Sequence, residues 1–163
     1  MISKKVQDAL NGQINAELYS EYMYLSMSAW FESENLKGMA HWMALQAQEE
    51  HAHAMKFFKF IIERGGQVAL KAIDAPPAQW DSPLAAFQAV SEHEQKVTGL
   101  INKLADLAEK EGDRATAVLL QWFITEQVEE EASAAQIVRN LEMIGEQTGP
   151  LFMFDSVLGQ RGK

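Results

Sequence analysis

The chain has 163 residues, of which 47% are hydrophobic and 23% are charged, as expected for a globular protein large enough to bury a core. It contains no cysteine, which excludes disulfides, cysteine–zinc sites and thiol catalysis. The net charge of −9 argues against nucleic-acid and anionic-membrane partners and favours cations, and no apolar run approaches membrane-spanning length.

The first predicted helix spans about residues 3–34, and Ser3 has the side chain of an N-cap at its start. No apolar signal segment precedes this helix, so we expect a cytoplasmic protein. Steps of four and three residues trace one mainly apolar face, with the acid Glu17 at mid-height and Tyr24 two turns further on. That face reads Leu10, Ile14, Glu17, Glu21, Tyr24, Ser28 and Phe31.

The second predicted helix, 37–64, should lie antiparallel to the first because only a short break separates them. Its inward face carries Glu50 and His53, one turn apart, between apolar ends. Polar groups in a core are costly unless they are paired or bind a metal, and Glu-x-x-His can direct an oxygen and a nitrogen ligand at one ion. Alone, the motif is more often solvated helix surface, so its meaning depends on the other helices. The face reads Met39, Met43, Gln46, Glu50, His53, Phe57 and Phe60.

A loop of about 17 residues, 65–81, follows the glycine pair Gly65-Gly66 and contains Pro76-Pro77. Seventeen extended residues reach ~55 Å, whereas a helix of some 28 residues is ~42 Å long. The loop can therefore cross the whole bundle, which would leave the third helix parallel to the second.

The third predicted helix, 82–111, starts with Ser82 as N-cap and Pro83 in the first turn, and its inward face is apolar apart from Glu94. The fourth, 114–144, follows a tight turn and carries Gln127 and Glu130 at the centre of its inward face. The two faces read Phe87, Val90, Glu94, Val97, Ile101, Leu104 and Ala108, and Thr116, Leu120, Phe123, Gln127, Glu130, Ala134, Ile137, Leu141 and Ile144.

All four inward faces are thus interrupted once by polar residues, at matching heights. The spacing repeats, because Glu17 to Glu50 is 33 residues (50 − 17) and Glu94 to Gln127 is also 33 (127 − 94). A buried hydrogen-bonded network is the alternative to a metal site, but several buried carboxylates without a cation would repel one another. Carboxylates with one imidazole suit ferrous iron or manganese rather than zinc, and such a set is the pattern of di-iron carboxylate bundles.

A short fifth helix is predicted over about 149–159, after Thr148-Gly149-Pro150. It is apolar on most sides, which suggests that it packs against neighbouring subunits. The alternative is that it folds back on the bundle as a fifth core element. Its apolar residues are Leu151, Phe152, Phe154, Val157 and Leu158.

These features together resemble the non-haem bacterial ferritins over essentially the full length of the chain. The matching features are Glu17, Tyr24, Glu50-x-x-His53, Glu94, Trp122, Gln127-x-x-Glu130, the long crossover and the short terminal helix. The resemblance implies one all-α domain, a ferritin-like four-helix bundle with a short fifth helix. It also implies a homo-oligomeric cage of 24 subunits that oxidises Fe(II) with O2 or H2O2 and stores a ferric oxide-hydroxide mineral.

The resemblance also implies roles for single residues. Glu17, Glu50 and His53 would hold one iron, and Glu50, Glu94 and Glu130 the other, with Gln127 a polar residue near the site. Tyr24 and Trp122 match the aromatic residues that are redox-active in the family, although Trp122 could equally serve ordinary packing. Each subunit would bind two irons as substrate.

Two departures separate this chain from relatives of that family. Bacterioferritins have His in place of Glu130 and a haem-binding Met in place of His51, so no haem is expected. His51 and His93 are interpreted as ordinary surface histidines or as residues behind the ligands. Animal ferritins carry channel acids where this chain has Ala117 and Leu120, which leaves the iron entry route unassigned.

A third iron site is predicted beside the first two. Glu49, Glu126 and Glu129 each precede an inward position by one residue, a rotation of about 100° around the helix. The second and fourth helices should be antiparallel, so this step turns the three acids to the same flank, next to Glu130. The resemblance supports the site, since non-haem bacterial ferritins carry a third iron there. The alternative is that these acids are merely solvated.

Two other functions remain compatible with the pattern. A di-iron peroxidase of the rubrerythrin type would need an electron-delivery partner or a cysteine-rich domain, and the chain has no cysteine. A purely structural bundle would be indifferent to Fe(II).

Overall fold

The computed structural model describes all 163 residues, which form five helices and no strands. The helices are α1 (Lys4–Ser33), α2 (Lys37–Glu63), α3 (Pro83–Lys110), α4 (Arg114–Ile144) and α5 (Thr148–Leu158). The predicted all-α four-helix bundle with a long crossover and a short fifth helix is confirmed. None of the helices is both long and apolar enough to cross a bilayer.

Short polar side chains set the starts of three helices. Ser3 Oγ accepts from the amide of Val6 at 3.3 Å, and Ser82 Oγ accepts from the amide of Ala85 at 3.0 Å. Asp113 does the same for α4. Each satisfies a backbone amide that has no partner within its own helix. These local signals explain why the helices begin where they do.

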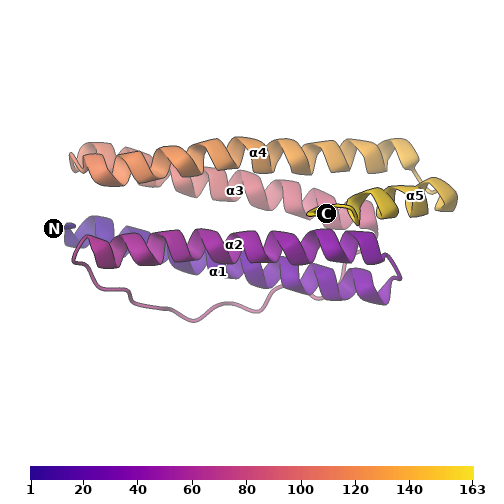
Figure 1. Cartoon of the computed structure of the whole chain (residues 1–163), viewed down its shortest axis with the longest axis horizontal. Coiled ribbons are helices and arrows are strands. Elements are labelled where there is room, and N and C mark those ends of the chain that lie inside the picture. The colour runs from indigo at the N-terminus through magenta and orange to yellow at the C-terminus, as the bar shows by residue number, and fades with distance from the viewer.

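The helices form two antiparallel hairpins, α1–α2 and α3–α4, which Figure 1 shows one above the other. The extended segment 64–82 runs the length of the bundle beside α1, so α3 is parallel to α2, and α4 is antiparallel to it (Figure 1). Several side chains of α1 fasten this crossover, among them Asn11 and Asn15. Asn11 bonds to the carbonyl of Gln67 at 3.0 Å and the amide of Ala69 at 2.8 Å, and Asn15 bonds to the carbonyl of Ala72 at 3.0 Å.

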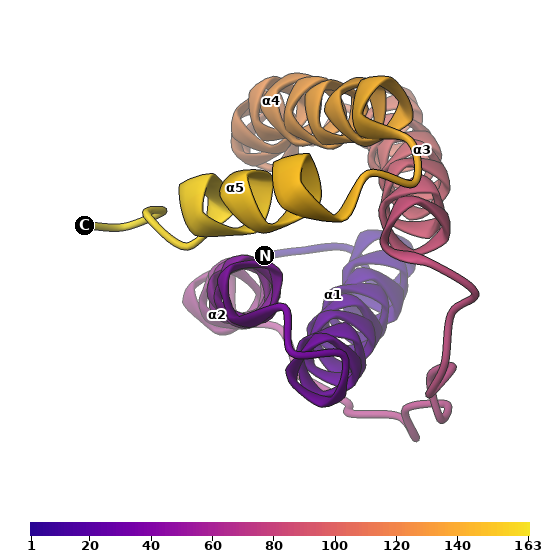
Figure 2. The ribbon, with the colours of Figure 1, turned by 90° about the vertical axis from the view of Figure 1, so that its right-hand side faces the viewer.

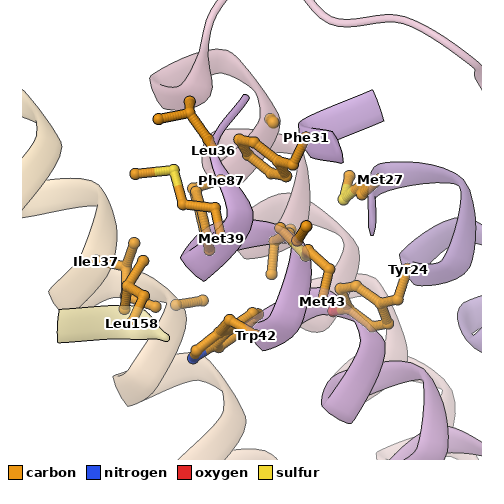
Figure 3. Packing of buried hydrophobic residues seen from close by; sticks show 14 of the residues in the cluster. Tyr24, Met27, Phe31, Leu36, Met39, Trp42, Met43, Phe87, Ile137 and Leu158 are labelled. Atoms are coloured by element: carbon orange, nitrogen blue, oxygen red, sulfur yellow. The ribbon is translucent and has the colours of Figure 1, made fainter. Parts of the chain in front are cut away.

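The hydrophobic core is divided in two along the bundle. A cluster of 17 buried residues fills the end that holds the α1–α2 turn and α5, and one of 11 fills the opposite end. Figure 3 shows part of the first cluster, where Leu158 of α5 lies beside Ile137 of α4. Most of the buried polar residues of the four long helices lie between the two clusters, among them Glu17, Glu50, Glu94 and Glu130. No Cα of α2 lies within 8 Å of a Cα of α4, which leaves room for long polar side chains between them.

Four positions of the predicted inward faces are not fully buried, and one of them is Ile144, which lies partly buried against the core at the end of α4. Glu21 keeps 31% of its side chain exposed, Ser28 is partly buried, and Ile61 takes the core position expected for Phe60. On α1 the core positions are instead Ser20 and Met27. An alternation of four- and three-residue steps averages 3.5 residues per turn, which drifts by ~20° per seven residues from a straight helix. The positions chosen by these alternating steps therefore drift off the buried face of the helix.

The fifth helix folds back on the bundle with one of its faces, as one of the two expectations for it states. It extends from the end of α4 toward α2 (Figure 2), and it buries Asp155 and Leu158 against the bundle. Its other face leaves Phe152, Met153 and Val157 between 48% and 73% exposed. One face of α5 is therefore part of the core, while the other is an apolar surface without a partner within the subunit.

Candidate metal centre

Five acidic and imidazole side chains from all four long helices meet in the polar layer between the two core clusters. The ligand atoms of Glu17, Glu50 and His53 lie within 4.8 Å of one another, and so do those of Glu50, Glu94 and Glu130. Glu50 belongs to both groups. One carboxylate common to two adjoining ligand sets is the arrangement by which helix bundles hold two metal ions side by side.

A third group includes Glu126, an acid that the sequence places at the predicted third iron site. His53, Glu126 and Glu130 also offer ligand atoms within 4.8 Å of one another. Nε2 of His53 lies 3.9 Å from Oε2 of Glu126, whose side chain is 29% exposed. The sequence places Glu126 only at the third iron site, and the structure brings it next to His53 and Glu130 as well.

Hydrogen bonds orient the carboxylate of Glu94. The hydroxyl of Tyr24 donates to Oε1 of Glu94, and Nε2 of Gln127 donates to Oε2 at 3.1 Å. The Gln127 amide also reaches Thr98 Oγ1 at 3.2 Å. Both oxygens of Glu94 are thus held from neighbouring helices. Tyr24 and Gln127 therefore position the carboxylate of Glu94.

Two buried glutamines, which the sequence reasoning did not assign to the site, hold the other carboxylates. Gln13 donates to Glu17 Oε1 at 2.8 Å, and Gln46 donates to Glu130 Oε2 at 2.7 Å and to Glu50 Oε1 at 3.2 Å. The 33-residue repeat in the sequence could have identified both glutamines. Gln13 and Gln46 are 33 residues apart (46 − 13), the same spacing as Glu17 and Glu50, and each lies four residues before its acid.

Burial and mutual repulsion raise the pKa of these carboxyl groups above the ordinary value. Burial, together with the charge of Glu50, raises the pKa of Glu17. Burial raises the pKa of Glu50 and Glu94, and the charges of Glu94 and Glu130 add to the effect on Glu50. Burial and the charge of Glu94 raise the pKa of Glu130 to about 7. A cation among them would reverse both effects, because it stabilises the charged form.

The phenol of Tyr24 responds to the same environment. Its pKa is raised, first by burial and then by the charge of Glu94. The hydroxyl therefore keeps its proton and remains a hydrogen-bond donor to Glu94.

The residues fit a metal rather than a closed hydrogen-bond network. Oε2 of Glu17 and Oε1 of Gln46 are buried without any hydrogen-bond partner. Both atoms are acceptors, and a buried acceptor without a donor is costly. A divalent cation would satisfy the Glu17 oxygen directly. The donor set of carboxylates and one imidazole suits Fe(II) or Mn(II).

An acidic pocket of about 320 Å³ adjoins the centre on the α2–α4 side. It contains the three acids predicted for the third site, together with Glu130. Glu49 and Glu129 do not join any of the close ligand groups, and Oε2 of Glu49 instead accepts a 2.8 Å hydrogen bond from Arg161. The lining residues are Trp42, Gln46, Glu49, Glu126, Glu129, Glu130, Ser133 and Arg161.

The remaining singled-out residues surround the centre. The ring of Trp122 lies 5.5 Å from that of His53 and is covered by the Lys56 amine at 4.1 Å. His51 is on the surface, with 56% of its side chain exposed, and bonds to Glu21 at 3.1 Å. His93 packs behind Tyr24 and contacts Ser20 Oγ at 2.7 Å. Burial, with the nearby charge of Lys96, lowers the pKa of His93 to about 4.

Known proteins match the chain over nearly its whole length. The ferritin-like domain family matches residues 7–144. A bacterial non-heme ferritin of Bacteroides fragilis (strain 638R) is 47% identical over 161 residues, which cover 99% of this chain and 100% of the relative. A bacterial non-heme ferritin of Staphylococcus aureus (strain MRSA252) is 35% identical over 161 residues, covering 99% and 97%.

Solved structures agree with these relatives. An open pore ferritin from the hyperthermophilic archaeon Archaeoglobus fulgidus matches with a TM-score of 0.98 and 54% identity, covering 99% of each chain. A closed form of that ferritin, engineered by site directed mutagenesis, matches with a TM-score of 0.98 and 54% identity, covering 99% of this chain and 98% of the other.

Proposed function

Because this chain belongs to the ferritin family, we propose that it stores iron by oxidising Fe(II) at a two-iron centre inside each subunit. The oxidised iron is deposited as a ferric oxide-hydroxide mineral inside a cage of 24 subunits. One observation carries the proposal: Glu50 belongs to two adjoining ligand groups, so a single carboxylate can bridge two ions. Iron is the substrate and the cargo, and no haem takes part.

In this proposal Glu17, Glu50 and His53 bind one Fe(II), while Glu50, Glu94 and Glu130 bind the other. Each Fe(II) gives one electron. Two electrons and two protons convert O2 to H2O2, and two electrons and two protons convert H2O2 to two waters. The carboxylates favour the step because their negative charge stabilises Fe(III) over Fe(II).

Tyr24 and Gln127 have supporting roles in the same reaction. Both hold Glu94, and the raised pKa of Tyr24 keeps its phenol protonated next to the carboxylate. Because the phenol bonds directly to Glu94, a proposed ligand, it could also serve as an electron donor to iron bound there. Gln127 would keep Glu94 in place while the other ligands of the iron rearrange as Fe(II) becomes Fe(III).

We place a third Fe(II) in the acidic pocket, bound by Glu49, Glu126 and Glu129 with Glu130 shared. Support comes from the lining of the pocket by all four acids and from the 3.9 Å approach of Glu126 to His53. A third iron there adds an electron to the reduction of O2 or holds iron on its way to the cavity. Glu129→Ala should keep the first oxidation of two irons but change the number of Fe(II) oxidised per O2, which an oxygen electrode measures. An unchanged ratio would exclude this third site.

Assembly into a cage is supported by the apolar face of α5. Phe152, Met153 and Val157 are exposed in the single subunit, and burial of such residues stabilises contacts between subunits. Analytical ultracentrifugation measures the assembly directly. A monomer or dimer at micromolar concentration would contradict the cage.

The two-iron centre can be tested with a matched pair of variants on α1. Glu17 is a proposed ligand, whereas Glu21, one turn further along, faces outward and pairs with His51. Metal-free protein is titrated anaerobically with Fe(II), exposed to O2, and followed by the absorbance of Fe(III). Glu17→Gln should bind fewer irons and lose rapid oxidation, while Glu21→Gln should behave like the parent. Equal traces for both variants would refute the assignment.

A further inference from the structure

The C-terminal tail places a cation at the acidic pocket. Nη2 of Arg161 donates to Glu49 Oε2 at 2.8 Å, and its Nη1 donates to the carbonyl oxygen of Trp42 at 3.2 Å. The guanidinium also lies over the Trp42 ring, 4.6 Å from its centre. Three contacts from one planar group fix it in place, and its side chain is only 24% exposed. Arg161 is the only basic residue among those that line the pocket.

The backbone of the tail is held in the same region. The carbonyl of Arg161 contacts His41 Nε2 at 2.9 Å, and α5, which precedes the tail, is fixed to α2 through Asp155. Arg161 therefore stays beside the pocket because α5 and the tail backbone are both fixed to α2. It is a permanent counter-ion at high local concentration and does not have to diffuse to the site.

A metal ion and the guanidinium compete for the same oxygens. Glu49 cannot present both carboxylate oxygens to a divalent cation while one of them accepts from Arg161. Two cations that approach the same pocket also repel each other. Binding of metal through both oxygens of Glu49 therefore requires Arg161 to withdraw, and binding through Oε1 alone places the metal next to the guanidinium charge. The contacts of Arg161 with Trp42 oppose its withdrawal.

We propose that Arg161 is a tethered competitor that sets the affinity of the acidic pocket for a divalent cation. The tail holds Glu49 when no metal is present and releases it when a cation enters. The pocket is thereby weakened relative to the two-metal centre, so iron fills the centre first and the pocket second. This inference rests on the proposed function, because it concerns the third iron site.

The test uses Mn(II) without an added oxidant, because it suits carboxylate and imidazole ligands and then binds without redox chemistry. The assembled, metal-free protein is titrated by calorimetry, and the cations bound per subunit are counted in the parent and in Arg161→Ala. The third, weaker binding event should tighten by about threefold to tenfold in the variant, since a partly exposed ion pair and a cation–π contact each contribute modestly. Lys163→Ala is the matched control, because it removes an exposed positive charge from the same tail without a contact to the pocket.

A conservative variant separates competition from simple fastening of the tail. Arg161→Lys keeps the charge but cannot span Glu49 and Trp42 with a rigid fork, so its third-site affinity should fall between those of the parent and Arg161→Ala. Hydrogen exchange gives a second readout. In the parent, exchange of the amides of 159–163 should accelerate when Mn(II) exceeds two equivalents per subunit.

Each result decides the matter. A third-site affinity in Arg161→Ala that equals or falls below that of the parent overturns the competition. The same change in Lys163→Ala would assign the effect to overall charge and also overturn it. If neither the parent nor the variant binds a third cation, the third site and this inference both fail while the two-metal centre stands. If the parent binds none, the proposed centre itself is wrong.

Discussion

The backbone amide of Met39 donates a 2.7 Å hydrogen bond to Oδ1 of Asp155, although 116 residues separate the two in sequence. The other carboxylate oxygen accepts from the amide of Gly38 at 3.0 Å. Leu36, at the start of α2, has no side chain that could cap the helix, and an acid from α5 does so instead. The first turn of α2 and the position of α5 are therefore stabilised by one interaction.

The first prediction concerns that cap. Asp155→Ala should lower stability by about 1–2 kcal/mol, because two buried amides at a helix start lose their acceptor. Asp155→Asn keeps one acceptor oxygen and should lose about half as much. Thermal unfolding of the metal-free protein measures both. Asp106→Ala, which removes an exposed acid from α3, is the control, and an equal loss in that variant would contradict a specific role for Asp155.

The second prediction concerns the close approach of α5 to Gly38. A Cβ at Gly38 would lie 1.7 Å from the backbone carbonyl oxygen of Asp155, so α5 must move away. Gly38→Ala should destabilise the subunit by about 1–3 kcal/mol and expose α5 to hydrogen exchange. Gly99→Ala, where the added Cβ meets nothing within 4 Å, should instead stabilise α3 by about 0.5–1 kcal/mol. Two variants of equal stability would refute the steric argument.

The third prediction concerns the shared carboxylate. Glu50→Ala should slow the fast phase of Fe(II) oxidation by at least about a hundredfold, because both proposed iron sites lose a ligand. The metal-free variant should be as stable as the parent or more so, since repulsion of Glu50 by Glu94 and Glu130 is removed. Stopped-flow absorbance and calorimetry measure these two quantities. Glu63→Ala, an exposed acid at the end of α2, should change neither.

The fourth prediction concerns pH. The folded-state pKa of Glu130 is about 7, above its ordinary value of 4.5, so the folded metal-free protein holds this proton more tightly than the unfolded chain. The resulting stabilisation is complete below about pH 4.5 and is lost as the pH rises toward 7. Glu130→Gln cannot titrate. The stability of the parent relative to this variant should therefore fall by on the order of 2 kcal/mol between pH 5 and pH 8.

The comparison with Glu130→Gln is needed because other groups titrate in the same range. The pKa of His93 is lowered to about 4, so its contribution to stability increases as the pH rises toward 6.5 and opposes that of Glu130. The pKa of Asp113 is lowered despite its partial burial, because Arg64 and Thr116 bond to it, and it acts only at lower pH. Both are common to parent and variant. A pH-independent difference between the two proteins would contradict the assignment to Glu130.

Local signals in the sequence predicted most of the fold. Ser3 and Ser82 lie at helix starts because their short polar side chains can cap the first turn. Pro83 suits the first turn because it has no backbone N–H that would need a partner. The length of the 65–81 loop predicted the parallel course of α2 and α3. The failures at Glu21 and Phe60 arose because a fixed walk does not follow the exact helical repeat over several turns.

The candidate centre was predictable where a residue lay on an inward stripe, as for Glu50 and Glu94. Gln13 and Gln46 were missed as supporting residues because only the acids were followed through the 33-residue repeat. Arg161 could not have been found. Its contact with Glu49 depends on where α5 docks, and that position is set by Gly38 and Asp155, far apart in the chain.

The split core has a mechanical consequence. Each subunit is built as two short apolar bundles joined end to end by a polar joint, and that joint is where the carboxylates repel one another. Repulsion among these carboxylates opposes close packing at mid-height, so we expect the middle of the metal-free bundle to be its most compliant part. Cations bound there would remove the repulsion and link the four long helices. A subunit that has taken up iron should therefore be stiffer than an empty one at the place where iron is bound.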